Sequence, residues 1–164
     1  MKKRFAILLV FSFYLLPSFA QEFIGCRTDS GWAETATLRK KFTLKGSDFK
    51  HHDFQTLRFT IEVTSLGYHE VYINHTRPGD NVLQPAVSQL NKHALGVTYD
   101  ITSLVHDGEN EIKLVIGQGW GRIYGTPAVV KAAVMREVSD DECGLSDFVV
   151  WTDSTWEAMP MEYS

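Results

Sequence analysis

Six segments of this chain alternate apolar and polar residues with a period of two, and no stretch sustains a period of 3.6 residues over three helical turns. Because successive side chains of a β-strand point to opposite faces, this pattern predicts strands that each bury one face. A single helical turn is expected at residues 100–105, where Asp100 or Thr102 can cap it. The predicted strands span residues 38–44, 57–63, 68–74, 111–116, 129–134 and 148–151.

The segments between these strands are rich in turn-forming residues. Gly46-Ser47-Asp48, Arg77-Pro78-Gly79-Asp80 and Asp107-Gly108-Glu109-Asn110 place glycine, proline or aspartate where the chain reverses. Short strands with turns every 8–12 residues or so are typical of a β-sandwich or a jelly roll. We therefore predict an all-β chain with one sandwich domain.

The first 20 residues have the pattern of a secretory signal. Lys2, Lys3 and Arg4 precede an apolar run over residues 5–16, and Ser18-Phe19-Ala20 supplies the small residues that a signal peptidase requires. We expect cleavage near Ala20 and a periplasmic or secreted product.

Charge and hydropathy exclude two classes of partner. Removing 20 of the 164 residues leaves 144, with 13 basic and 20 acidic residues and a net charge of −7. Such a chain lacks the basic block that neutralises phosphates, so we expect no nucleic-acid partner. No second apolar run approaches about 18 residues, so we also expect no membrane span.

The chain has two cysteines, Cys26 and Cys143, near the two ends of the exported part. In an exported protein such a pair is a candidate disulfide, which would close a long loop. The alternative is two unpaired thiols.

The densest group of potential metal ligands is His51-His52-Asp53. Adjacent residues in an extended segment point to opposite faces, and no further ligands follow at a recognisable spacing. We expect a surface loop here, and neither a metal nor another cofactor.

A glycine-rich segment, Gly117-Gln118-Gly119-Trp120-Gly121, follows a predicted strand. No helix is expected to start after it, which argues against a phosphate cradle. Aromatic rings stack on the apolar faces of sugars, so Trp120 and Tyr124 form a candidate carbohydrate platform, with Gln118 or Asn74 as readers of hydroxyl groups. The alternative is that Trp120 is a packing residue.

No catalytic residue is identified. Glycoside hydrolysis usually needs two carboxylates about 5–9.5 Å apart, and no Asp-x-Asp or Glu-x-Glu pair lies on a predicted strand. The Gly-x-Ser-x-Gly signature of a serine nucleophile is also absent.

Five segments, taken in order and spacing, resemble the N-terminal β-sandwich domain of bacterial α-L-rhamnosidases. The similarity runs from about Ala33 to Glu157, and Trp151-Thr152-Asp153 through Trp156 is similar to the strand that closes this domain. The segments are Leu66 to Asn74, Gly79 to Pro85, Thr98-Tyr99-Asp100-Ile101-Thr102, Gly108-Glu109-Asn110 and Ile116 to Trp120.

The resemblance implies a galactose-binding-like jelly roll. In whole enzymes of this family it precedes a helical barrel that removes terminal α-L-rhamnose and carries the acid and base. This sequence stops at Ser164, so we expect an exported, non-catalytic module from a truncated or split glycosidase, with a glycan or a separately encoded catalytic domain as its partner. The predicted organisation is a signal peptide over 1–20, an extension over 21–32, the sandwich over 33–158 and a tail over 159–164.

Two other readings are open: a stand-alone carbohydrate-binding protein, and the jelly roll of β-galactosidase-type enzymes. The second has a similar Asn…Gly…Gly-Glu-Asn pattern, but the Gly-Gln-Gly-Trp ending favours the rhamnosidase form. A domain that normally adjoins another should also expose an apolar patch, which we expect near Trp156, Met159 and Met161.

The sequence departs from the family pattern at two places. His75 follows Asn74 where the family has glycine, so we expect a turn of another type than the Asn-Gly hairpin. The stretch Ala86-Val87-Ser88-Gln89-Leu90 replaces the family's tryptophan and tyrosine after Pro85.

Overall fold

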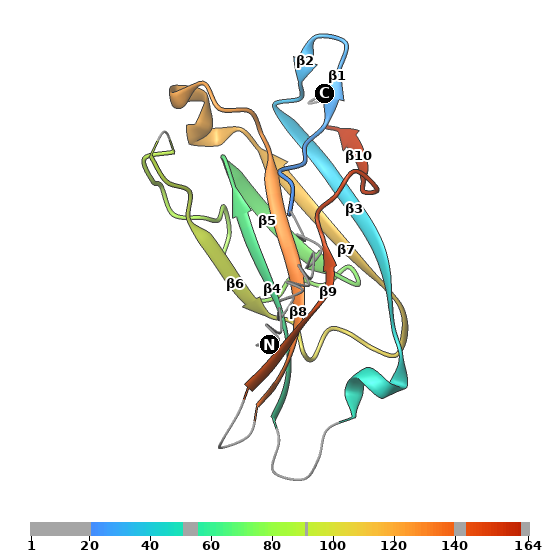
Figure 1. Cartoon of the computed structure of the whole chain (residues 1–164). Helices are drawn as coiled ribbons and strands as arrows, with labels where there is room; N and C mark the ends of the chain where they lie inside the picture. Colours follow the sequence, from blue (N-terminus) through green and yellow to red (C-terminus); the bar gives the residue numbers. More distant parts are fainter. Residues whose placement is uncertain (1–20, 51–55, 91, 140–143, 162–164) are drawn as a thin grey trace, which may run out of the picture.

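The computed structural model describes residues 21–50, 56–90, 92–139 and 144–161. Two four-stranded antiparallel sheets pack face to face (Figure 1). This arrangement confirms the predicted all-β jelly-roll sandwich. The first sheet, in the order β10-β3-β7-β5, contains β3 (Thr35–Leu44), β5 (Tyr68–Ile73), β7 (Gly108–Gly117) and β10 (Glu157–Pro160). The second, in the order β6-β4-β8-β9, contains β4 (Thr56–Ser65), β6 (Gly96–Asp100), β8 (Val130–Ser139) and β9 (Gly144–Trp151).

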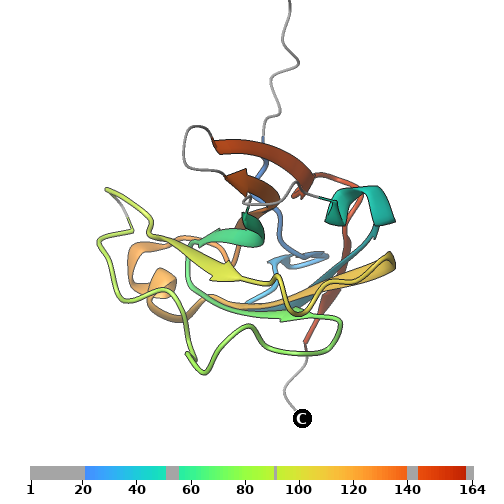
Figure 2. The same ribbon diagram turned by 90° about the horizontal axis from the view of Figure 1, so that it is seen from below.

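The core lies between the two sheets, which form separate layers when the sandwich is seen along its length (Figure 2). The buried residues follow the alternation in the sequence, because each strand turns one set of side chains inward. Leu38 on β3, Leu114 on β7 and Ile61 on β4 are all fully buried. The buried faces predicted for these strands are therefore confirmed.

Two strands lie outside the sequence prediction. β6 pairs with β4 from Thr60 to Thr64, and β10 pairs with β3, running through Pro160 into the predicted tail. The expected helical turn after β6 is a single hydrogen-bonded turn, in which Val105 N–H donates to the carbonyl of Ile101 at 3.2 Å.

The hairpin after β5 corrects the expected turn type. The N–H and C=O of Ile73 both bond to Thr76 at 2.8 Å, which closes a two-residue turn. Asn74 and His75 have φ values of 47° and 68°, the left-handed pair that an Asn-Gly hairpin would adopt. The chain therefore keeps this turn with histidine in the glycine position.

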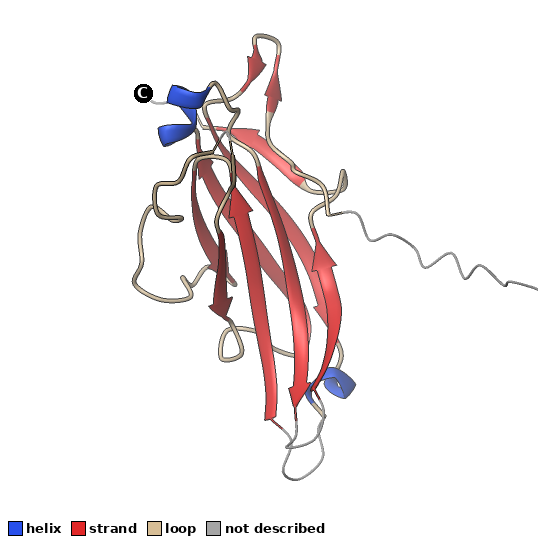
Figure 3. Ribbon diagram, turned by 60° about the vertical axis from the view of Figure 1, so that its left-hand side comes forward, coloured by secondary structure: helices blue, strands red, loops and turns tan. Residues whose placement is uncertain are grey.

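Short 3-10 helices mark the two ends of the sandwich (Figure 3). η1 (Gly46–Phe49) follows β3, and η2 (Gly119–Tyr124) follows β7. A small hairpin of β1 (Arg27–Thr28) and β2 (Gly31–Trp32) lies at the same end as η2 (Figure 1). Within the described part of the chain, no helix is long and apolar enough to cross a membrane.

Candidate functional site

The glycine-rich segment forms η2, which presents three large side chains to solvent. Trp120 is 44% exposed, Tyr124 is 38% exposed and Ile123 is 69% exposed. The structure therefore brings Trp120 and Tyr124 together on one short helix. Exposed aromatic rings on a fixed backbone are suited to stacking on a sugar ring.

Close backbone packing explains the glycines of this segment. Gly119 has a φ of 45° and lies against the ring of Tyr68, so that a Cβ there would collide with the ring. A Cβ on Gly121 would lie 3.0 Å from the carbonyl oxygen of Leu66. A Cβ on Gly67 would likewise collide with the carbonyl oxygens of Gly117 and Gln118. These contacts fasten η2 to the turn between β4 and β5.

Two hydrogen bonds of Gln118 hold η2 in position. Its side-chain amide donates to the carbonyl of Thr126 at 2.8 Å, and its backbone N–H donates to the carbonyl of Glu34 at 2.8 Å. The guanidinium of Arg122 lies 3.7 Å from the carboxylate of Glu34. The side-chain amide of Gln118 therefore holds the loop that carries Trp120.

Asn74 lies at the other end of β5, away from Trp120. Tyr68 at the start of β5 pairs with Gly117, whereas Asn74 N–H bonds to Glu111. The side chain of Asn74 donates to the carbonyl of Leu104 at 2.9 Å and accepts from the N–H of Glu111 at 2.9 Å. The structure thus places Asn74 away from Trp120, with its amide bonded to Leu104 and Glu111.

A buried polar network lies close to η2 and was not predicted from the sequence. His69 is 1% exposed; its Nδ1 is 2.8 Å from Ser65 Oγ and its Nε2 is 3.1 Å from the hydroxyl of Tyr99. Burial lowers the pKa of His69 to about 4 and raises the pKa of Tyr99 to about 12. Ser65 Oγ also bonds to the carbonyl of Gly67 at 3.0 Å. Ser65 is 1% exposed, so the network supports the β4–β5 turn and presents no nucleophile to solvent.

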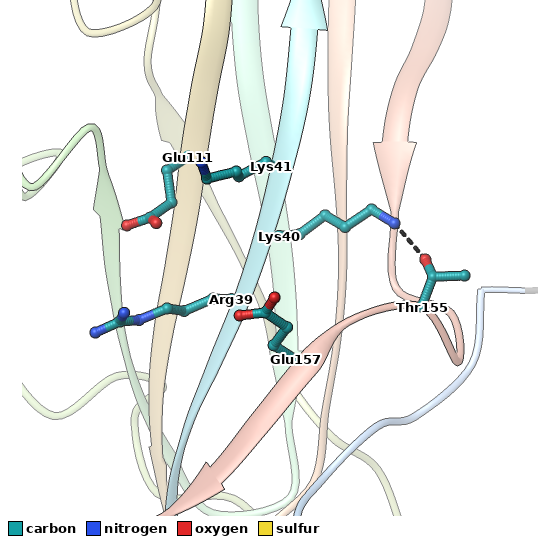
Figure 4. Close-up of a pocket in the computed structure, with 6 residues that line it drawn as sticks. All are labelled: Arg39, Lys40, Lys41, Glu111, Thr155 and Glu157. Atoms are coloured by element: carbon teal, nitrogen blue, oxygen red, sulfur yellow. Dashed lines mark hydrogen bonds between the residues drawn. The ribbon is translucent and has the colours of Figure 1, made fainter.

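A charged notch of about 370 Å³ lies where β10 begins beside β3 (Figure 4). Lys40 and Arg39 point to opposite sides, and Lys40 donates to the hydroxyl of Thr155. The Nε of Arg39 is the one buried side-chain polar atom without a hydrogen-bond partner in the described parts of the chain. Glu111 and Glu157 line the notch among these basic groups. Neither has the apolar surroundings that a general acid requires.

Two predicted groups lie outside the described residues: His51-His52-Asp53 and Cys143. Among residues that are described, no three His, Cys, Asp or Glu side chains are grouped to hold a metal ion. Cys26 is buried and free.

The expected apolar patch near the C-terminal strand needs one correction. Met159 and Met161 are exposed by 46% and 44%, as predicted, but Trp156 is only 8% exposed. Its indole N–H donates to the carbonyl of Trp151 at 3.0 Å. Trp156 thus belongs to the edge of the core.

Comparisons with known proteins agree on one family. The model of the α-L-rhamnosidase N-terminal domain matches residues 55–160. An α-L-rhamnosidase of Formosa agariphila is 33% identical over 129 residues, which cover 74% of this chain and 13% of that protein. A second one from the same organism is 40% identical over 60 residues, or 37% of this chain and 6% of the relative. The chain thus spans only a small part of these relatives.

Solved structures give the same architecture. The α-L-rhamnosidase from Dictyoglumus thermophilum superposes with a TM-score of 0.59 at 25% identity, covering 79% of this chain and 13% of that one. A GH78 family rhamnosidase of Bacillus sp. GL1 also has a TM-score of 0.59, with 17% identity and coverage of 86% and 13%. At such identity the second likeness concerns the fold alone.

Proposed function

Because this chain belongs to the α-L-rhamnosidase N-terminal domain family, we propose that it is an exported, non-catalytic module that binds glycans processed by an α-L-rhamnosidase. The observation that carries the proposal is the placement of Trp120 and Tyr124. Both rings are exposed on η2, which glycine contacts fasten to the sandwich. Such a preformed aromatic surface loses little conformational entropy on stacking against a sugar.

The pKa shifts of two carboxyl groups support a non-catalytic role. An inverting glycosidase needs one carboxylic acid with a raised pKa and a second carboxylate about 6.5–9.5 Å away. Hydrogen bonds from Thr102 lower the pKa of Asp100, and hydrogen bonds from Thr155 lower the pKa of Asp153. Both shifts stabilise the ionised form, which is the opposite of what a general acid requires.

Export is supported by the sequence at the N-terminus. Three basic residues, an apolar run and the small residues at Ser18 and Ala20 have the order of a secretory signal.

The proposal is tested on the chain from Gln21 onward. We expect no turnover of an aryl α-L-rhamnoside, and calorimetric binding of a rhamnose-containing oligosaccharide in the millimolar range or better. Trp120→Ala should weaken this binding about tenfold, whereas Phe148→Ala, which removes a 49% exposed ring on β9, should not. Turnover that co-purifies with the protein, or binding unaffected by Trp120→Ala, would contradict the proposal.

A second candidate is docking to a separately encoded catalytic domain. The exposed Met159 and Met161 on and after the edge strand β10 favour it, since flexible methionines adapt to a partner surface. Co-purification with an α-L-rhamnosidase barrel, lost in a Met159→Asp, Met161→Asp double variant, is the measurement.

A further inference from the structure

A groove of about 240 Å³ lies between the N-terminal segment and the connection from β9 to β10. Its walls include Phe23, Trp32 and Trp156, and its polar lining consists of Glu22, Arg27, Asp153 and Ser154. Phe23 and Trp32 precede the region that the family model matches, which starts at residue 55. The groove is therefore formed by the N-terminal segment on one side and the connection to β10 on the other.

Three aromatic rings give the groove its apolar surface. Phe23 is 42% exposed and Trp32 is 39% exposed, whereas Trp156 is 8% exposed and forms part of the floor. The guanidinium of Arg27 lies 4.1 Å from the ring centroid of Trp32, which holds the indole in place. The rings are thus both accessible and oriented.

Backbone bonds hold the N-terminal wall at a fixed position. Ile24 exchanges two hydrogen bonds of 2.8 Å with Val130 at the start of β8. Thr152 Oγ1 donates to the carbonyl of Glu22 at 2.7 Å, and Glu22 N–H donates back to Thr152 at 3.2 Å. A groove whose walls are fixed before binding requires little ordering of the protein by its ligand.

The polar lining determines the chemistry of the ligand. Asp153 accepts from the N–H of Thr155 at 2.9 Å, and its side chain is still 38% exposed. Its carboxylate and that of Glu22 can accept hydrogen bonds from hydroxyl groups, and Ser154 can donate or accept. The guanidinium of Arg27 also lines the groove, and Lys40 Nζ lies 3.9 Å from the carboxylate of Asp153, so the charges around the groove offset one another. The aromatic walls suit C–H groups, and together with these donors and acceptors they fit an uncharged polyhydroxylated ring.

We propose that this groove binds one neutral sugar ring, stacked on Trp32 or Phe23 with its hydroxyls at Asp153, as a second contact beside the η2 platform. The volume suits a single ring, because pockets for drug-sized ligands start at about 300 Å³. Gln118 joins η2 to Glu34, two residues beyond Trp32, so both aromatic surfaces lie at the same end of the sandwich (Figure 1). The ligand class rests on the proposed function, but the groove is a separate site.

The four tryptophans provide separate readouts in one experiment. The chain from Gln21 onward contains Trp32, Trp120, Trp151 and Trp156, so the indole region of a ¹H–¹⁵N spectrum holds four assignable signals. Methyl α-L-rhamnoside, methyl β-D-galactoside and methyl β-D-glucoside are the probes, with sodium glucuronate as the anionic comparison. We expect at least one neutral glycoside to shift the Trp32 and Trp156 signals together, and glucuronate to bind no more tightly than that glycoside.

Variants separate this site from η2. Trp32→Ala should weaken the affinity measured at Trp156 about tenfold or more, while Trp120→Ala and Phe148→Ala leave it within twofold. Phe23→Ala, from the same N-terminal segment, gives the same test if Trp32→Ala does not fold. No shift at Trp32 and Trp156 with 50 mM of any neutral glycoside would overturn the proposal. A shift at Trp120 alone would overturn it while supporting the η2 platform.

Discussion

Ser65 Oγ and His69 Nδ1 lie 2.8 Å apart, and both side chains are buried inside the sandwich. Ser65 gives its one hydroxyl proton to the carbonyl of Gly67 at 3.0 Å, so His69 Nδ1–H must be the donor in the contact between them. Nε2 then carries a lone pair and accepts from the Tyr99 hydroxyl at 3.1 Å. The network is complete only while His69 is neutral.

This requirement predicts a pH-dependent stability. Burial lowers the pKa of His69 from 6.5 to about 4, so the unfolded chain takes up the proton first as the pH falls. The contribution of His69 is fully present above pH 6.5 and is lost between pH 6.5 and 4, by about 3 kcal/mol in total. Urea unfolding at pH 7.5, 5.5 and 4 measures it. His69→Gln should flatten the profile relative to the natural chain, whereas the exposed His106→Gln should not; equal slopes for both would refute the assignment.

The contact between Gly119 and Tyr68 predicts a second effect. Gly119→Ala meets two penalties, a φ of 45° and a collision with the Tyr68 ring. Gly125→Ala meets only the first, because φ is 66° and nothing lies within 4 Å of its Cβ position. We expect losses in the free energy of unfolding of about 2–4 kcal/mol and about 1 kcal/mol respectively. Similar thermal midpoints for the two variants would show that the ring contact contributes nothing.

Local alternation was sufficient to predict the core but not two of the four edge strands, β6 and β10. Ile112, Leu114 and Ile116 are buried because a period of two is a property of the strand itself. β6 has no fully buried residue and all four residues of β10 are exposed, so neither of these two strands carries a strongly apolar face in its sequence. Both are held by pairing with strands distant in the sequence, which no local signal contains.

The candidate site also combines features that local sequence predicts with features that depend on residues distant in the chain. Trp120 and Tyr124 were predicted because a glycine-rich loop with aromatics is visible within a few residues. The role of Asn74 was not, because its partners Leu104, Asn110 and Glu111 are 30, 36 and 37 residues away. The aromatic groove likewise depends on residues from both ends of the chain.

The bonds of Asn74 predict a structural phenotype. Asn74→Ala removes its donor bonds to Leu104 and Asn110 and its acceptor bond from Glu111 N–H, and it leaves a positive φ on alanine. We expect a loss of about 2–4 kcal/mol in the free energy of unfolding, with glycan binding unchanged at low temperature. The exposed Asn81→Ala is the matched control and should remain within about 0.5 kcal/mol. A stable Asn74→Ala protein that no longer binds glycan would restore the hydroxyl-reading role.

The position of Cys26 predicts two free thiols instead of the candidate disulfide. Cys26 is 4% exposed and follows Ile24, which pairs with Val130 at the start of β8. Gly144, the residue after Cys143, pairs with Ser139 at the far end of β8, about 30 Å along the strand. A disulfide requires Cα atoms within about 7 Å. Iodoacetamide in denaturant without reductant should therefore add two carbamidomethyl groups to the chain from Gln21 onward, and under native conditions Cys26 should react slowly. A mass that changes only after reduction would establish the bridge and require a rearrangement of this end of the sandwich.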